Sequence, residues 1–340
     1  LCIKTWSYNV YAIAAPTCTS YTCVIMKSMF MDRFLFNRAV SWIQTYTTTD
    51  MESVFDNATQ FNMDVNGWNT SQVTTMKSMF SAASKFNQSL SKWNTGSVTN
   101  MDQAFREANR FDRNINHWDT RKVTTTVEMF YSATAFNQPI GEWDTSAVAL
   151  TINMFEFASS FNQDINGWDM GANTAAAGMF CNASNFNQPL SKWNTNKVTG
   201  MMHMFSYASK FNGNIGKWNT GAVTFMNYMF DFASSFNQDI GNWNVSNVHT
   251  KKFLNTTFTI FDGSAFYAVN TCNDPTCTAS SKSPWYEPSI TTSTTTTNYT
   301  NAGKPATKDD SEVEFGQFYL FVAFGMICVY LVYALFSDHS

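Results

Sequence analysis

The stretch MFSAASKFNQSLSKWNTGSVTNM, residues 79–101, has a large apolar residue every few positions and mostly Asn, Gln, Ser or Thr between them. Trp93 lies in the middle of its most polar part. The rest of the chain explains this arrangement, because residues of the same type recur every 25 positions over about nine copies. The chain is therefore a repeat array whose turns mainly contact their neighbours. The predicted core columns contain Trp68, Trp93, Trp118, Trp143, Trp168, Trp193, Trp218 and Trp243, together with Phe80, Phe86, Phe130 and Phe136.

Within one repeat, two spacings of apolar residues indicate two elements of secondary structure. From Val73 to Phe86 the apolar positions follow each other at intervals of three or four, as on one face of an amphipathic helix. Trp93 and Thr95 are two positions apart, as on one face of a strand, with Asn94 facing the other way. We therefore predict an α/β repeat solenoid of leucine-rich-repeat type, with one helix and one short parallel strand per 25-residue turn.

The energetics of a single turn predict that the Trp column is buried. Ordering 25 residues costs on the order of 25–50 kcal/mol of conformational entropy. Each apolar anchor returns only about 1.5–3 kcal/mol, and only once it is covered. A turn alone therefore cannot fold. Stacking on identical neighbours covers the apolar anchors and makes folding favourable. This favours a buried column over a row of exposed rings that bind a ligand.

The Asn of the FNQ triplet also recurs in register, with Asp112 in its place once. A buried Asn side chain must be hydrogen-bonded. In a stacked column, the backbone of the adjacent turn can satisfy each side-chain amide. We therefore predict an Asn ladder along the array. Its members are Asn62, Asn87, Asn137, Asn162, Asn187, Asn212 and Asn237.

Composition and motif searches argue against several classes of function. The net charge is -4 and 14% of residues are charged, whereas a nucleic-acid surface needs clustered Lys and Arg. His117, His203 and His249 occupy different repeat registers, and no nucleophile and base share a meaningful spacing. The Asp residues of one register are interrupted by Ser, Asn and Pro, which argues against a calcium ladder. We expect no enzymatic activity, no cofactor, no metal site and no nucleic-acid partner.

Pairs of cysteines flank the array. Cys18 and Cys23 precede it, and Cys272 and Cys277 follow it, each pair with the spacing C-x4-C. A disulfide within each pair would staple the end turns, which lack an outer neighbour. Unpaired thiols are the alternative, and a metal site fits less well because no His or second Cys pair accompanies either one.

Two further segments follow the array. Residues 280–314 are rich in Thr, Ser and Pro, which predicts a stalk, either O-glycosylated or an unmodified linker. Residues 315–336 carry no charge over 22 positions, which predicts a single transmembrane helix of roughly 30 Å. The alternatives are a buried helix and a glycolipid-anchor signal, and its aromatic residues would also suit a helix partner in the membrane. The predicted segments are an N-terminal cap (1–24), the solenoid (25–262), a C-terminal cap (263–279), the stalk (280–314), the membrane helix (315–336) and a short tail (337–340).

Different residues favour different orientations in the membrane. Lys304 and Lys308 precede the apolar segment and nothing basic follows it, which favours a tail anchor with the repeats in the cytosol. The cysteine pairs, the Thr-rich stalk and the N-x-S/T sequons instead favour repeats outside, at a cell surface, and we adopt this placement. Asn87 lies in a sequon but is assigned to the ladder. We expect the sequon columns of the array to face solvent. The candidate N-glycosylation sites are Asn57, Asn69, Asn182, Asn244, Asn255 and Asn298.

Two further features distinguish individual turns. In residues 168–180, Asn173 replaces the usual Val and Ala176 replaces the usual Met, so looser packing is expected there. Elsewhere one register changes its charge from turn to turn, which fits recognition of a ligand and equally fits neutral drift. Its members are Ser81, Arg106, Tyr131, Glu156, Cys181, Ser206 and Asp231.

The repeat unit MF-xx-A-xx-FNQ-x-I/L-xx-W-N/D-T-S-x-VT-x-M resembles that of BspA-like leucine-rich-repeat surface proteins. Residues 79–101 and 229–248 carry it, and the resemblance covers about residues 25–262. The resemblance implies a solenoid displayed at a cell surface, often in adhesion or protein binding, with no family-wide catalytic residues. The Thr-rich stalk and the C-terminal apolar segment are departures from the family pattern.

Two hypotheses of function follow from the sequence. The first is a non-enzymatic surface protein whose solenoid binds a protein or glycan ligand, with residues 315–336 in the lipid bilayer. The alternative is a structural subunit, packed into an extracellular filament or a membrane protein complex. A binder should present one face of varied, exposed residues, whereas a subunit should bury a long flank against a partner.

Overall fold

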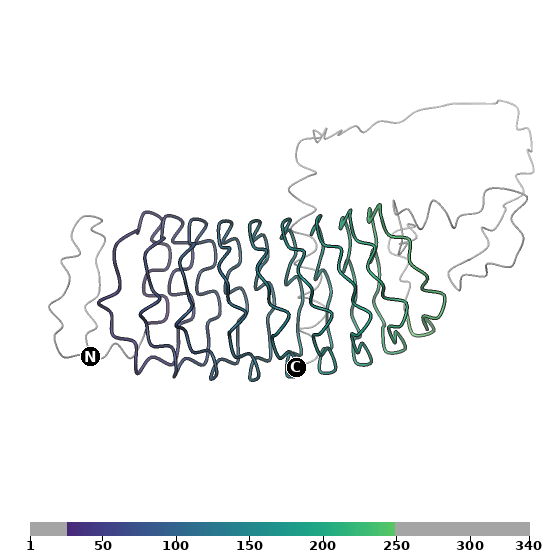
Figure 1. Cartoon of the computed structure of the whole chain (residues 1–340), viewed down its shortest axis with the longest axis horizontal. Coiled ribbons are helices and arrows are strands. Elements are labelled where there is room, and N and C mark those ends of the chain that lie inside the picture. The colour runs from purple at the N-terminus through teal and green to yellow at the C-terminus, as the bar shows by residue number, and fades with distance from the viewer. Residues whose placement is uncertain (1–25, 249–340) are drawn as a thin grey trace, which may run out of the picture. The chain divides into compact units, whose positions relative to one another are not determined.

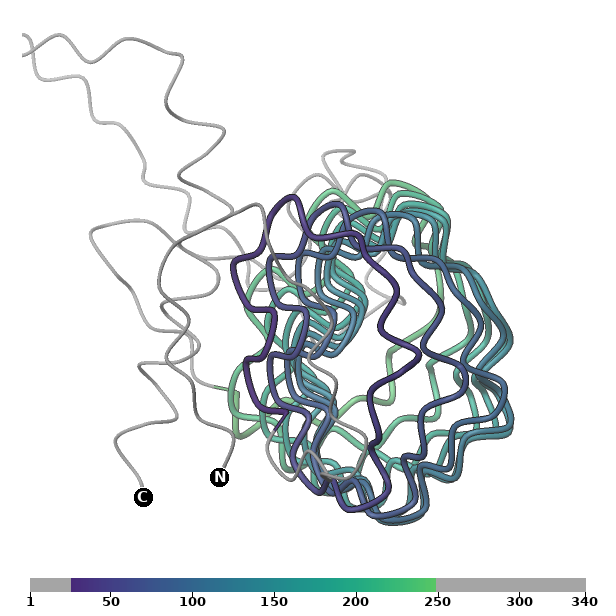
Figure 2. The same ribbon diagram turned by 90° about the vertical axis from the view of Figure 1, so that its left-hand side faces the viewer.

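The computed structural model describes residues 26–248, which belong to one compact unit, Leu1–Cys277. The chain winds into successive 25-residue coils that lie side by side in chain order (Figure 1). Viewed along the stack, the coils superpose around a common interior (Figure 2). The predicted end caps, the stalk and the apolar segment 315–336 lie outside the described residues.

The coils are built from turns, and the predicted α/β architecture is wrong. Residues 26–248 contain no helix and no extended strand, and hence no helix long and apolar enough to cross a membrane. Neighbouring coils are joined by isolated parallel bridges, of which Thr75–Asn100 is one. Each coil also contains one six-residue run of turns, called here a turn run. The turn runs are residues 27–32, 52–57, 77–82, 102–107, 127–132, 152–157, 177–182, 202–207 and 227–232.

Hydrogen bonding within a turn run shows why it is not a helix. Ser78 and Ala82 donate their backbone N–H groups to carbonyls of the next coil, at 2.8 and 2.7 Å. Met79, between them, donates to Met76 three positions back, at 3.1 Å. Ser78 and Ala82 have φ angles of 53° and 51°, in the left-handed region that a right-handed helix excludes. The N–H groups therefore alternate between their own coil and the next one.

The apolar spacing that suggested a helix has a different cause. The apolar residues from Val73 to Phe86 are buried except for the half-buried Ala82, and an amphipathic helix would also require this. Consecutive turns with hydrogen bonds three residues apart bring every third or fourth side chain to the same side, so they have nearly the same periodicity. Each left-handed residue costs about 1–2 kcal/mol. The backbone hydrogen bonds to the neighbouring coil offset this cost. These bonds form only when the coils are stacked.

The predicted strand has the expected alternation but not the expected pairing. Trp93 and Thr95 are buried and Asn94 is exposed. The hydroxyl Oγ1 of Thr95 donates to the backbone carbonyl of Asp119 in the next coil at 3.0 Å. Because side-chain hydroxyls make the contact between coils here, no ladder of backbone hydrogen bonds forms around Trp93.

Stacked aromatic rings fill the interior. Phe80 lies 3.9 Å from Phe86 in its own coil and 5.6 Å from Phe105 in the next, measured between ring centroids. The Trp rings are only 2–4% exposed, and Trp93 stacks on Trp118 at 6.3 Å with 5° between the ring planes. The indole N–H of Trp93 donates to the carbonyl of the preceding coil at 3.0 Å. The same bond is made by Trp68, Trp143, Trp168, Trp193, Trp218 and Trp243.

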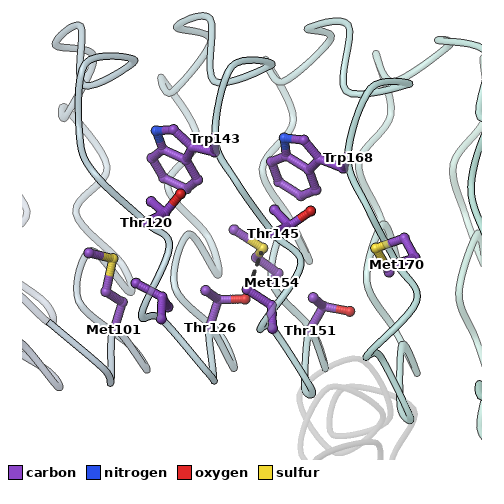
Figure 3. Close-up of a pocket in the computed structure, with 11 residues that line it drawn as sticks. Met101, Thr120, Thr126, Trp143, Thr145, Thr151, Met154, Trp168 and Met170 are labelled. Carbon is purple, nitrogen blue, oxygen red and sulfur yellow. Dashed lines mark hydrogen bonds between the residues drawn. The ribbon is translucent and has the colours of Figure 1, made fainter. Parts of the chain in front are cut away.

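A small cavity lies in the interior between the coils of Trp143 and Trp168 (Figure 3). Thr126 and Thr151 stand here at a register that most other coils fill with Met, and the hydroxyl of Thr126 donates to the sulfur of Met154 at 3.3 Å. The cavity has a volume of about 10 Å³, at the lower limit for one water molecule. It is therefore a packing defect rather than a ligand site.

Asn173 is a second defect in the same region. The eight other described coils carry Val or Thr at this register, and Asn173 is completely buried. Its Nδ2 donates to the Thr151 hydroxyl at 3.1 Å, but its Oδ1 has no hydrogen-bond partner in the described part of the chain. A buried carbonyl oxygen without a partner costs about 1–3 kcal/mol.

We predict that Asn173→Val stabilises the protein. The substitution restores the apolar column and removes the unsatisfied oxygen, so the free energy of unfolding should rise by about 1–2 kcal/mol. Thr151 keeps the carbonyl of Ala175 as an acceptor. Thermal and urea unfolding of the full chain measure the change, with the exposed Asn194→Val as control. A lower unfolding midpoint than the unsubstituted protein would contradict the prediction.

Candidate functional site

The Asn ladder is an architectural feature of the stack. The side-chain oxygen of Asn62 accepts the backbone N–H of Asn87 at 2.9 Å, and the side-chain amide of Gln88 adds a second bond to the same oxygen at 3.0 Å. These Asn side chains are half-buried or exposed rather than fully buried. Equivalent bonds join Asn87–Asp112, Asp112–Asn137, Asn137–Asn162, Asn162–Asn187, Asn187–Asn212 and Asn212–Asn237.

The ladder uses only the side-chain oxygen as an acceptor from the next coil, which explains why Asp112 fits. We predict that Asn162→Asp changes stability by no more than about 0.5 kcal/mol, since a carboxylate keeps both bonds from Asn187 and Gln188. Asn162→Ala leaves those donors unpaired and should destabilise by about 1–3 kcal/mol. Urea unfolding compares the free energies of unfolding of the two variants. Equal decreases in both would show that the side-chain acceptor oxygen does not stabilise the ladder.

The sequons within the described coils divide into two columns. Asn69 and Asn244 are exposed, and their side-chain oxygens accept the N–H groups two residues ahead at 3.0 Å. Asn57 and Asn182 are half-buried left-handed residues, so the expectation that both columns face solvent is met by the first alone. The amide of Asn57 donates to Asp32 in the preceding coil at 3.0 Å. Asn255 and Asn298 lie outside the described residues.

The four cysteines predicted to form disulfides, Cys18, Cys23, Cys272 and Cys277, also lie outside the described residues. Cys181 is within them and is a buried thiol. Among residues 26–248, no three His, Cys, Asp or Glu side chains are grouped as ligands for a metal ion.

The surface that varies most between coils is formed by the turn runs. From the run 52–57 onwards the third and fourth residues enter the core, as Met129 and Phe130 do. The first, second, fifth and sixth residues form the outer part of the run, although several of them, such as Val127 and Ser206, are buried. Together they are called here the turn-run face. The fifth position is the register predicted for recognition, but Glu156 and Cys181 there are buried. The sixth position is the more exposed one in most coils.

A cluster of charged side chains occupies the middle of the turn-run face. Arg106 contacts Glu128 at 2.9 Å and Glu107 at 2.6 Å, and its guanidinium lies 4.7 Å from the ring centroid of Tyr131. Gln103 donates a further hydrogen bond to Glu128 at 2.9 Å. Glu128 is almost fully buried, so this carboxylate depends on both donors.

Glu156, in the next coil, is a buried carboxyl without such donors. It is 2% exposed, and its Oε2 has no hydrogen-bond partner within residues 26–248. Burial, followed by the charge of Glu128, raises its pKa from 4.5 to about 8. A hydrogen bond with Cys181 and the charge of Arg106 oppose this rise.

Glu156 should therefore make the stability of the protein depend on pH. Between pH 4.5 and about 8 the unfolded chain loses a proton that the folded chain keeps. Stability then falls as the pH rises, by about 1.4 kcal/mol per pH unit within this window.

We predict that Glu156→Gln removes this part of the pH dependence and stabilises the protein at pH 8 relative to the unsubstituted chain. Urea unfolding at pH 5 and pH 8 measures the effect, and Glu142→Gln, at an exposed site, is the control. Parallel pH profiles for the unsubstituted protein and Glu156→Gln would contradict the assignment.

Aromatic side chains dominate the turn-run face towards its C-terminal coils. Tyr207 and Phe232 stack at 4.7 Å although 48% and 46% of their surfaces are exposed. His203 and Tyr228 stack beside them at 4.9 Å, and burial lowers the pKa of His203 to about 4, so it is neutral at pH 7. In addition, Tyr131 makes an edge contact with a ring of the following coil at 5.6 Å.

The residues that carry these rings have an unfavourable backbone conformation. His203, Tyr207, Tyr228 and Phe232 have φ angles of 53–57°, and Phe157 has 58°. Left-handed φ angles suit Gly, Asn or Asp, and bulky residues there are strained. Apart from Phe157, other coils place smaller or polar residues (Ser, Asn, Asp, Gly, Ala, Gln or Glu) at the same registers. The exposed rings add little to the core, so packing does not explain them.

The sequence contained a signal for these aromatic residues that was not used. Tyr207 and Phe232 fall outside the periodic Phe and Trp registers, so the repeat does not require them. Sequence analysis placed the variable surface one position earlier, because it selected the register whose charge changes from turn to turn, and that register is partly buried.

Stacked coils with an invariant interior and a variable outer face define a solenoid repeat protein. The chain belongs to the family described as Mycoplasma protein of unknown function, DUF285, whose model matches residues 19–114, 99–199 and 178–265. These overlapping matches cover all of the described coils. No curated protein matches the chain.

Proposed function

We propose that this protein is a non-enzymatic binding protein, which uses the turn-run face to hold a protein or glycan ligand at a cell surface. The observation that carries the proposal is the exposed, stacked pair of Tyr207 and Phe232. A contiguous exposed apolar patch on an otherwise polar protein marks a surface for interaction. Aromatic side chains are also the residues that contribute most to binding energy at interfaces.

Backbone strain supports the same proposal. Each left-handed aromatic residue costs of order 1–3 kcal/mol, and such residues cluster at sites where the strain serves a function. Asn would relieve part of the strain at Tyr207 and Phe232, as at Asn182 in the coil before Tyr207. A ligand that covers the rings would explain why aromatic residues stand there instead.

Two observations support the cell-surface placement. The repeat resembles that of BspA-like surface proteins, which are often involved in adhesion. The exposed Asn69 and Asn244 could accept glycans without disturbing the ladder, which fits a glycoprotein with its repeats outside the cytosol.

A binding screen tests the proposal. The full chain is offered to immobilised extracellular proteins and glycans, side by side with Tyr207→Ser/Phe232→Ser and with the control Tyr46→Ser. Tyr46 is 49% exposed in the first described coil and lies outside the turn-run face. We expect a ligand that the unsubstituted protein and the control bind and that the double variant binds about tenfold less tightly.

Two results of the screen would overturn the proposal. One is that every ligand found binds the double variant as tightly as the unsubstituted protein. The other is that the native chain is recovered in a stoichiometric complex that buries a different flank of the coils, which would favour the structural-subunit alternative. Matching thermal unfolding midpoints ensure that the variants are folded.

A further inference from the structure

We infer that the turn-run face binds an aromatic side chain of another protein, and that this side chain stacks between Phe157 and Tyr207 over Asn182. The place between the two rings is called here the Asn182 position. This inference rests on the proposed function and names the group that the face recognises.

The sixth residues of the C-terminal turn runs form a column of aromatic side chains that is interrupted once. Phe157, Tyr207 and Phe232 belong to this column, and Asn182 stands between the first two. Tyr207 stacks on Phe232, on its side away from Asn182, with 4.7 Å between the ring centroids and 22° between the ring planes. One coil step therefore places two rings of this column at a normal stacking distance.

The spacing at the interruption fits one further ring. Phe157 and Tyr207 are two coil steps apart, which is roughly 9.6 Å. A ring midway between them would lie about 4.8 Å from each, within the range in which aromatic rings stack. Phe157 makes its edge contact with Tyr131 in the preceding coil, on the side away from Asn182, so this contact does not occupy the Asn182 position.

The turn run 177–182 is built from small outer residues. Asn182 is half-buried and is the outer residue of this run that solvent reaches, because the others are buried. The ring of Tyr207, in the next run, is 48% exposed. A ligand ring therefore meets the side chain of Asn182 and the flanking rings. The outer residues of the run are, in order, Ala177, Gly178, Cys181 and Asn182.

Backbone conformation explains the absence of a ring of the chain's own at this position. Asn182 has a φ angle of 57° and Tyr207 one of 56°. Asn tolerates this left-handed conformation, whereas a bulky side chain is strained in it. A ring that a partner supplies completes the aromatic column without a further strained residue in the chain.

The charge of the surroundings favours an uncharged ring. The three turn runs 152–157, 177–182 and 202–207 contain one acidic side chain, Glu156, and one basic side chain, His203. Burial raises the pKa of Glu156 to about 8 and lowers the pKa of His203 to about 4, so both are mainly neutral at pH 7. A charged group of a ligand would lose its hydration here without gaining an ion pair from these runs.

Two other occupants fit less well. A sugar ring can stack on Tyr207, but its hydroxyl groups need hydrogen-bond partners that the side chains of Phe157 and Ala177 do not provide. A second copy of this chain can offer Trp42, which is 44% exposed in the first described coil. Such a contact joins two different surfaces and extends into an open filament, as in the structural-subunit alternative.

Small uncharged compounds test the inference on the full chain. The probe is N-acetyl-tryptophan amide, and the comparison compounds are N-acetyl-leucine amide and methyl glucoside. Titrations followed by saturation-transfer NMR of the compounds measure the weak binding expected of such small molecules. We expect the tryptophan amide to bind about tenfold more tightly than either comparison compound, because its ring stacks on two rings at once.

Matched variants locate the binding at the Asn182 position. Asn182→Tyr fills this position with a ring of the chain itself and should weaken binding of the tryptophan amide at least about tenfold. Asn57→Tyr makes the same change at the same register, in a half-buried residue with a φ angle of 59°. The residues before and after Asn57 in the column, Asp32 and Ala82, carry no ring. This control should therefore bind the probe as the unsubstituted protein does.

A second variant removes one flanking ring. Tyr207→Asn should weaken binding of the tryptophan amide about fivefold, and Asn suits the left-handed backbone at this residue, so the variant should fold. Tyr46→Asn removes an exposed ring outside the turn-run face and should leave the binding unchanged. Thermal unfolding midpoints verify that each variant is folded.

The outcomes separate this inference from the proposed function. Equal binding of the three compounds, or unchanged binding of the tryptophan amide by Asn182→Tyr, overturns the inference. A screen ligand that is lost in Tyr207→Ser/Phe232→Ser but is still bound by Asn182→Tyr also overturns it while leaving the proposed function intact. A glycan ligand that Asn182→Tyr no longer binds would replace the aromatic side chain with a sugar ring. Self-association that Asn182→Tyr abolishes would replace the separate protein with a second copy.

Discussion

In the turn runs, alternate backbone N–H groups donate to the coil that follows, and the rest of the structure depends on these bonds. They require left-handed residues at two positions of a run, such as Ser78 and Ala82, and these conformations exclude a helix. The bonds also hold the coils in register, so that Phe80 stacks on Phe105 and Trp93 on Trp118. A coil removed from the stack would keep the cost of its strained residues and lose the bonds that offset it, so neighbouring coils fold together.

Because the buried core and the backbone hydrogen bonds hold the coils together, the outer side chains can vary. The core residues and the hydrogen-bonded backbone define each coil, and the ladder from Asn62 onwards tolerates Asp112 because only an acceptor oxygen is needed. The turn-run face can therefore change from charged to aromatic within a few coils without a change of fold. The strained rings of Tyr207 and Phe232 and the unsatisfied Oε2 of Glu156 are departures from good packing, and such departures concentrate at functional sites.

Sequence analysis found part of this site and missed the rest. The period placed Trp93 inside, where it is 4% exposed, and it placed the ladder between adjacent coils. It did not find the aromatic face, because it took the fifth position of each turn run, which includes the buried Glu156, as the surface column. That position was selected because its charge changes from turn to turn, and a change of charge does not show that a side chain is exposed.

The sequence by itself determined the 25-residue repeat, the identity of the core residues and the need for stacking, because these follow from composition and spacing alone. The tertiary structure decided the backbone conformation, since the hydrogen bonds that stabilise left-handed residues come from a coil 24 or 25 positions away. It also decided which outer positions are exposed. Local spacing cannot distinguish a helix from a series of turns when both bury every third or fourth residue, and only contacts between coils make that choice.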